Sequence, residues 1–297
     1  MKDNTNTSLA KETKNLLKKY DLKLKSSLGQ NFLIDNNKRI QIIKFAELSK
    51  KDTVLEIGPG IGTLSLELAK HVSKLICIEQ DKRVASILES RVEENHIDNI
   101  EIINDDALKV EFDKFNKVVS NLPYQISSPI TFKLLEYPFD RAVLMYQKEF
   151  AQRMLSAVGD KNYSRLYVML AFKVNTEFLM DVPKECFMPK PKVDSAVVKL
   201  IPNHKFNMEN KEEKQLFEDY EKIAKALFQH KNKKSENALI NSRHEIGYND
   251  KKELKIKLED IKNDKLNKLL NKRPINLSPE EILDLTRLLQ ELFKNKF

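Results

Sequence analysis

The chain has 297 residues, of which 41% are apolar, so it is long enough to bury a sizeable core without disulfides or structural metals. Its two cysteines, Cys77 and Cys186, form no C-x-x-C motif, which argues against a disulfide framework and against a zinc site. The formal charge is +8, and a basic surplus of this size points to a polyanionic partner.

The positive charge is unevenly distributed along the chain. Residues 1–50 hold 11 basic and 5 acidic residues, residues 51–202 hold 20 and 22, and residues 203–297 hold 21 and 17. Basic ends around a nearly neutral middle indicate that the ends contact phosphates. No apolar run reaches the roughly 18 residues that span a bilayer, and no signal peptide is visible, so we expect a cytoplasmic protein without a membrane partner.

Residues 1–25 are polar and lysine-rich, with one amphipathic patch around Leu16, Leu17 and Tyr20, and predict a mobile arm or a marginal helix. From Lys51 on, short runs rich in β-branched residues alternate with amphipathic stretches of helical length. The expected strands are 53–57, 74–79, 100–103, 117–121 and 141–146, and the expected helices are 64–71, 83–95, 130–137 and 149–158. This alternation predicts an α/β fold with a parallel sheet covered by helices.

Two further strands, at 175–182 and 193–201, flank a proline-marked loop and predict an antiparallel pair at one edge of the sheet. After Pro202, apolar residues at three-and-four spacing predict helices at 213–229, 250–259, 264–271 and 279–295. Ser278 is expected to cap the last helix, with Glu281 completing a capping box. We therefore expect a basic arm at 1–27, an α/β domain at 28–202 and an all-helical domain at 203–297.

Three of the six glycines, Gly58, Gly60 and Gly62, lie between the first expected strand and its helix. Glycine lets the backbone turn sharply and approach a ligand at the carboxyl end of that strand. Glu79 ends the second strand, where a carboxylate can accept both hydroxyls of a ribose, and Asp106 follows the third, within reach of an adenine. The loop predicts a nucleoside cofactor over a plain turn, but it leaves a nicotinamide dinucleotide and S-adenosylmethionine (SAM) both open.

The motif Asn121-Leu122-Pro123-Tyr124 follows the fourth expected strand and indicates the reaction. The exocyclic amine of adenine is a poor nucleophile because its lone pair is delocalised into the ring. The side-chain carbonyl of Asn121 and the backbone carbonyl of Leu122 can hold the amine hydrogens and stabilise the charge that develops on methylation. Pro123 keeps the backbone extended, and Tyr124 offers a ring on which an extruded base stacks, worth about 1–3 kcal/mol. The alternative is a strand end followed by a turn.

Five stretches together resemble the KsgA/Erm family of rRNA adenine N6-dimethyltransferases. They are Leu28-Gly29-Gln30-Asn31-Phe32-Leu33, the glycine loop with Ile78-Glu79, Asp106-Ala107, residues 121–129, and residues 187–195. The sequence of residues 121–129 is most similar to the archaeal branch of the family, whose enzymes dimethylate two adjacent adenosines near the 3′ end of small-subunit rRNA. The resemblance implies a Rossmann-like SAM-dependent methyltransferase sheet, a helical RNA-binding domain and a role in small-subunit biogenesis.

The resemblance also implies roles for individual residues. The cofactor contacts are Asn31 and Leu33 at the methionine end, Gly58 and Gly60 in the loop, Glu79 at the ribose, Asp106 at the adenine, and Asn121 between cofactor and target amine. Phe187 is similar to a second aromatic residue beside the target base, with a core aromatic anchoring its loop as the alternative. The implied partner is small-subunit rRNA or an assembling small ribosomal subunit, bound by a monomer without a metal.

Three other functions stay open. A DNA adenine methyltransferase would share the Asn121 motif, although about 95 helical residues are few for a domain that reads sequence. A protein-glutamine methyltransferase would use the motif on an amide nitrogen and would not need basic ends. A binding-only ribosome-assembly factor would keep the fold without turnover. The lysine run at 231–234 is either a solvated face or a phosphate contact.

Overall fold

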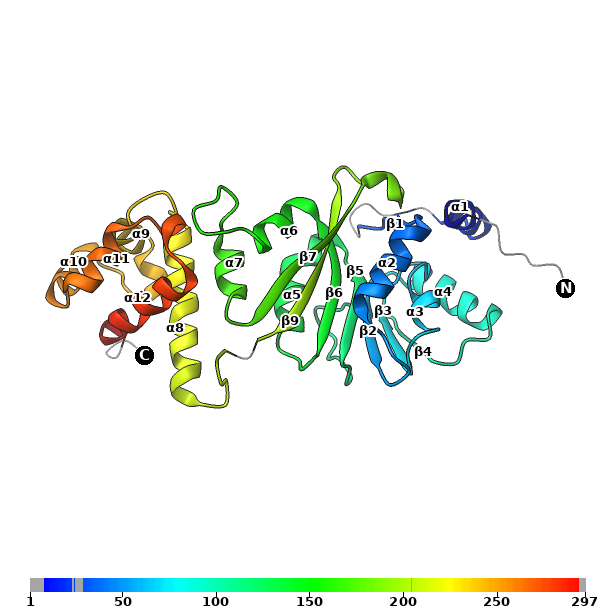
Figure 1. Ribbon diagram of the computed structural model, residues 1–297, viewed down its shortest axis with the longest axis horizontal. Coiled ribbons are helices and arrows are strands. Elements are labelled where there is room, and N and C mark those ends of the chain that lie inside the picture. Colours follow the sequence, from blue (N-terminus) through cyan, green and yellow to red (C-terminus); the bar gives the residue numbers. More distant parts are fainter. Residues whose placement is uncertain (1–7, 23, 25–28, 204, 294–297) are drawn as a thin grey trace. The chain divides into compact units, whose positions relative to one another are not determined.

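The computed structural model describes residues 8–22, 24, 29–203 and 205–293, the last three as backbone alone (Figure 1). Leu28, where the resemblance begins, and residues 1–7, 23 and 25–27 of the expected arm lie outside the described residues. The chain divides into two compact units. The first contains the described residues up to Ala151 together with Thr176–Pro202, and the second contains Gln152–Asn175 and the described residues from Asn203 on.

The first unit is built on a seven-stranded sheet with the order β4-β3-β2-β5-β6-β9-β7 (Figure 1). The strands are β2 (Thr53–Ile57), β3 (Lys74–Ile78), β4 (Ile100–Ile103), β5 (Lys117–Asn121), β6 (Arg141–Gln147), β7 (Val174–Val182) and β9 (Ser195–Pro202). The strands β2 to β6 run parallel, and β9 pairs antiparallel with β6. The expected α/β sheet, mostly parallel with an antiparallel edge, is confirmed.

Short apolar runs form the strands because both faces of a parallel sheet are covered. Val54, Leu55, Val118 and Val143 are completely buried. The helices between the strands are α2 (Asn36–Ala46), α3 (Ser65–Leu68), α4 (Lys82–Glu94), α5 (Ser127–Leu134) and α6 (Lys148–Met154). The helix α3 is shorter than the expected 64–71 because the residues after it continue as turns, with Lys70 N donating to Glu67 O and His71 N to Leu68 O.

The strand order reverses at β2, since β3 and β4 lie on one side of it and β5 and β6 on the other. Open α/β sheets bind ligands at the carboxyl ends of the strands beside such a reversal. The glycine loop, Glu79, Asp106 and Asn121 lie at or just beyond the carboxyl ends of β2, β3, β4 and β5. The fold therefore brings these predicted site residues to one edge of the sheet.

The described part of the expected N-terminal arm contains a docked helix. The helix α1 (Leu9–Lys19) begins after Ser8, whose hydroxyl accepts a hydrogen bond from Lys11 N at 3.3 Å. Its Glu12 pairs with Arg91 of α4. Leu16, Leu17 and Tyr20 pack on a buried cluster of Leu22, Phe32, Ile61, Val84 and Ile87. Of the two alternatives expected for the arm, residues 9–19 form the helix, and the mobile alternative is corrected for them because their apolar face is covered.

The second unit is helical among its described residues. Its helices are α7 (Arg165–Leu170), α8 (Lys211–Phe228), α9 (Ser235–Asn241), α10 (Lys251–Asp260), α11 (Asp264–Asn271) and α12 (Pro279–Phe293), and α8 packs against α7, α9 and α12. The capping box forms: Glu281 N donates to Ser278 Oγ and Ser278 N to Glu281 Oε2, both at 3.1 Å. In the described ranges, no helix has both the length and the apolar character to cross a membrane.

The boundary between the two units differs from the expected one at residue 202. Residues 152–175, expected in the α/β domain, group with the helical unit. Tyr163, Val168 and Phe172 belong to its hydrophobic core. Tyr220 Oη of α8 donates to Val168 O at 2.8 Å. Sequence periodicity did not reveal this exchange because it depends on packing between segments about 50 residues apart.

Candidate active site at the carboxyl edge of the sheet

A cleft follows the carboxyl edge of the sheet, from residues 29–33 across the glycine loop to Asn121, Pro123, Gln125 and Ile126. The predicted site residues Leu122 and Tyr124 are not among its described lining residues. Four carboxyl side chains line it, those of Glu56, Glu79, Asp105 and Asp106. Among its described lining residues there is no lysine, arginine or histidine. A lining with the carboxylates of Glu79, Asp105 and Asp106 and no basic side chain suits a cationic ligand and disfavours the phosphates of a dinucleotide. Of the two cofactors that the glycine loop left open, it therefore fits SAM, which carries a sulfonium and an ammonium group.

The glycine loop is held between the Asn121 motif and residues 32–33. Gly58 has a φ of +69°, and a Cβ there would lie 2.9 Å from Pro123 Cγ. Gly60 has a φ of +60°, and a Cβ there would lie 2.7 Å from Phe32 Cε1. Positive φ and close approach each require glycine. The two glycines thus let both walls of the cleft come close to the loop.

Glu79 is fixed at the middle of the cleft and is only 9% exposed. Its Oε2 accepts a hydrogen bond from Gly60 N at 3.1 Å, and its Oε1 accepts one from Asp81 N at 2.9 Å. Each carboxylate oxygen can accept a second bond, which fits a pair of ribose hydroxyls. Asp106 lines the adjoining part of the cleft, and its Oδ1 accepts from Leu108 N at 3.0 Å.

Glu56 lines the same cleft, although no motif in the sequence predicted a role for it. It is 1% exposed, and burial raises the pKa of its carboxyl to about 8. Cys77 Sγ donates a hydrogen bond to its Oε2 at 3.7 Å. The available signal was a carboxylate within the apolar run of residues 54–57, two positions before Gly58.

Asn121 ends β5 with its amide group oriented by a backbone carbonyl. Its Nδ2 donates to Asn31 O at 3.0 Å, and Asn31 Nδ2 donates to Gly29 O at 3.2 Å. Because the nitrogen faces Asn31, the Oδ1 of Asn121 points away from it. Within the described part of the chain, neither this oxygen nor Leu122 O accepts a hydrogen bond. Two carbonyl oxygens of consecutive residues are therefore available to a donor such as an amine.

Tyr124 follows the extended Pro123, whose φ is −58° and ψ 123°, and begins a short 3-10 turn over Tyr124–Ile126. Its hydroxyl shares a hydrogen bond of 2.6 Å with Ser195 Oγ. Burial raises the pKa of Tyr124, so the hydroxyl stays neutral over the physiological range. The ring is partly exposed, as a stacking surface must be.

Leu33 and Phe187 meet in a two-stranded ladder that sequence reasoning missed. The strand β1 (Phe32–Leu33) pairs antiparallel with β8 (Phe187–Met188), with Leu33 opposite Phe187. Leu33 lines the cleft, whereas Phe187 is 3% exposed in an apolar cluster and is not among the described cleft-lining residues. This placement favours the anchoring alternative for Phe187, and its contact with a target base stays a prediction.

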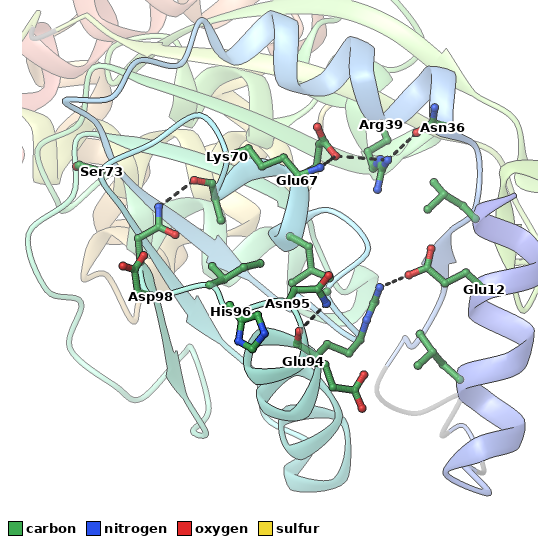
Figure 2. Close-up of a pocket in the computed structure, with 18 of the residues that line it drawn as sticks. Glu12, Asn36, Arg39, Glu67, Lys70, Ser73, Glu94, Asn95, His96 and Asp98 are labelled. Carbon is green, nitrogen blue, oxygen red and sulfur yellow. Dashed lines mark hydrogen bonds and ion pairs between the residues drawn. The ribbon is translucent and has the colours of Figure 1, made fainter. Parts of the chain in front are cut away.

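A wider groove, of about 1160 Å³, lies between α1, α2, α3 and the end of α4 (Figure 2). Several of its charged side chains pair with one another: Glu12 with Arg91, Glu67 with Arg39 at 3.6 Å, and Glu67 with Lys70 at 2.9 Å. Gly62 at the end of the glycine loop lines it, but none of the residues to which the resemblance gives a role is among its described lining residues. The groove marks the docking of α1, and the predicted chemistry belongs to the cleft.

The sheet order, the glycine loop and the Asn121 motif define a methyltransferase with a Rossmann-like sheet. A family model described as "Ribosomal RNA adenine dimethylase" matches residues 21–276. A "Probable ribosomal RNA small subunit methyltransferase A" of Methanosphaera stadtmanae is 48% identical, covering 94% of this chain and 98% of that protein. One of Thermococcus sibiricus is also 48% identical, covering 93% and 95%. The chain belongs to the ribosomal RNA adenine dimethylase family.

Two solved structures are similar over most of this chain. A dimethyladenosine transferase from Plasmodium falciparum is 32% identical, with a TM-score of 0.73 over 88% of this chain and 98% of that one. A 23S rRNA methyltransferase, ErmE, is 29% identical, with a TM-score of 0.63 over 88% of this chain and 100% of that one. Both similarities extend beyond the sheet alone.

Proposed function

We propose that this chain transfers methyl groups from SAM to the N6 amines of two adjacent adenosines in a hairpin loop near the 3′ end of small-subunit rRNA, during small-subunit biogenesis. Support for the substrate comes from the names of relatives with 48% identity, and support for SAM comes from the family and from the carboxylate-lined cleft. The observation that carries the proposal is the orientation of Asn121, whose Nδ2 is bound to Asn31 O.

When bound, SAM supplies an electrophilic methyl group on a sulfonium centre. In this proposal Asn31 and Leu33 contact its methionine end, while Glu79 accepts from its ribose and Asp106 addresses its adenine. The target amine donates its hydrogens to Asn121 Oδ1 and Leu122 O, which stabilise the positive charge that develops on N6. The methylated amine is cationic and releases its proton to water, so no general base is required. Tyr124 stacks on the extruded base, which leaves a loop more cheaply than a duplex.

A single assay distinguishes this function from its alternatives. The protein is incubated with methyl-labelled SAM and, in separate reactions, undermethylated small ribosomal subunits, naked rRNA, DNA and a protein extract. We expect label on adenine of the small subunits or their rRNA. Label in DNA or protein would select one of the other methyltransferase classes. Binding to subunits without any label would indicate an assembly factor and contradict the proposal.

A further inference from the structure

We propose that Ser195 is a positioning residue for methyl transfer, because its hydroxyl holds the ring of Tyr124 in the orientation that base stacking requires. This inference rests on the proposed function, since it concerns the same target base. Ser195 is the last residue of the stretch 187–195, one of the five that resemble the family, but the resemblance implied no role for it. It is 71 positions from Tyr124 in sequence, and only the fold brings the two together.

The contact joins a side chain on a turn to a side chain on a rigid strand. Tyr124 begins a three-residue 3-10 turn, whereas Ser195 begins β9 and is completely buried. The backbone before Ser195 is fixed as well, because Lys148 N donates to Asp194 O at 2.9 Å. A site residue is held most accurately when its partner lies on a packed element. Ser195 is therefore placed to fix Tyr124, and not the reverse.

The hydroxyl of Tyr124 has a purpose that stacking alone does not give it. A phenylalanine would offer the same apolar ring to a base. Among the described residues, the hydrogen bond of this hydroxyl is the one with Ser195 Oγ, at 2.6 Å. The bond restrains the rotation of the ring about its two side-chain torsions. Its loss would leave the ring in place but less well oriented.

The residue before Ser195 supports the other predicted aromatic residue. Asp194 Oδ1 accepts a hydrogen bond from Lys184 N at 3.0 Å, in the 3-10 turn over Lys184–Cys186. Phe187 follows that turn directly. Two consecutive side chains at the start of β9 thus bind the turn before Phe187 and the ring of Tyr124. The start of β9 serves as a common support for both.

The kinetic test is a double-mutant cycle of Ser195→Ala and Tyr124→Phe, each of which removes the same hydrogen bond. We expect each single variant to lower kcat on small subunits about three- to tenfold, with unchanged affinity for S-adenosylhomocysteine. The double variant should be no slower than the slower single variant. Ser235→Ala is the matched control, because it deletes another completely buried hydroxyl, which donates to Lys272 O at 2.9 Å in the helical unit. Its kcat should stay at the wild-type value.

The proposal would be overturned if the reductions in kcat of the two single variants multiplied in the double variant. An unchanged kcat in Tyr124→Phe would also overturn it. The latter variant leaves β9 intact, so it decides the question even where Ser195→Ala fails to fold.

A spectroscopic readout separates this proposal from the proposed function. In protein labelled with 3-fluorotyrosine, the fluorine signal that vanishes in Tyr124→Phe belongs to Tyr124. We expect Ser195→Ala to shift this signal and Ser235→Ala to leave it in place. A wild-type protein that methylates no adenine would refute the proposed function, while the fluorine spectra would still decide whether Ser195 holds the ring. A Tyr124 signal unmoved by Ser195→Ala would refute the role of Ser195.

Discussion

Asn121 and Glu56 line the same cleft, and their surroundings fix the orientation of the first and the protonation state of the second. Asn121 is oriented by a hydrogen bond from its Nδ2 to Asn31 O, which leaves its carbonyl oxygen available. Glu56 is prepared by burial, which raises the pKa of its carboxyl to about 8 and keeps it largely protonated at neutral pH. The first residue was predictable from a motif. The second was not, because its behaviour depends on the packing around one carboxyl group.

The pKa of Glu56 predicts how stability depends on pH in the ligand-free protein. The folded chain holds this proton up to a pH of about 8, whereas an ordinary glutamate loses it near 4.5. Between these values the folded state binds more protons, so the contribution is complete at low pH and is lost as pH rises through about 8. We expect the free energy of unfolding of the wild type to fall by roughly 1.4 kcal/mol per pH unit from this group in that window.

Urea unfolding at several pH values measures this dependence. Glu56→Gln, which cannot ionise, should flatten the slope, and Glu89→Gln on the exposed surface of α4 should preserve it. A Glu56→Gln variant with the wild-type slope would show that Glu56 is ionised in the folded state.

At the scale of elements, sequence pattern located most of the sheet and much of the helical unit. The strands at 53–57, 100–103 and 117–121 form over the expected residues because each is a short apolar run between turn residues. The two-residue strands β1 and β8 have no such pattern, and their pairing is purely tertiary. Leu16 and Leu17 indicated the apolar face of α1 in the sequence. The surface that covers this face, which includes Phe32 and Ile87, could not be predicted from the sequence.

The lysine run after α8 divides into structural and exposed positions. Lys231 Nζ donates to Lys161 O at 3.0 Å and to Tyr163 O at 2.9 Å, whereas Lys233 is exposed. We expect Lys231→Gln to lower Tm, because it leaves two carbonyl groups without their donor. We expect Lys233→Gln to keep Tm and to reduce the slope of log Kd for rRNA against log salt by about 0.7–0.9.

Thermal unfolding and filter binding over a range of salt concentrations compare the two lysine variants. Equal effects of Lys231→Gln and Lys233→Gln on Tm would contradict the assignment of a structural role to Lys231 alone. An unchanged salt slope in Lys233→Gln would contradict a phosphate contact of Lys233.

At the scale of the whole molecule, the distribution of charge matches a cofactor cleft in the middle of the chain and phosphate contacts at its two ends. The net charge of +8 hides a middle segment with more acidic than basic residues, and that segment supplies the four carboxyl groups of the cleft. The basic surplus lies in the first 50 residues and after residue 202. Part of it is internally paired, as Lys19 is with Glu94 at 2.9 Å. Composition alone could not separate paired from free lysines.

Salt should therefore affect the affinity for small-subunit rRNA and the affinity for S-adenosylhomocysteine differently. We expect the affinity for small-subunit rRNA to fall steeply as salt rises, because each phosphate contact releases counterions. The affinity for S-adenosylhomocysteine, bound in a cleft without phosphate contacts, should change little over the same range. Parallel titrations of both ligands measure this. Salt-insensitive rRNA binding would refute the assignment of the basic ends to phosphates.

The central claim is that the oriented carbonyl of Asn121 allows methylation of adenine N6, and nucleoside analysis of methylated small subunits tests it most directly. Asn116, directly before the start of the same strand, accepts a hydrogen bond from Thr53 N through its Oδ1 at 2.9 Å and provides the matched control. We expect N6,N6-dimethyladenosine from the wild type and from Asn116→Ala. For Asn121→Ala we expect at least a roughly hundredfold slower reaction with nearly unchanged affinity for S-adenosylhomocysteine. Dimethyladenosine formed by Asn121→Ala at the wild-type rate would contradict the account.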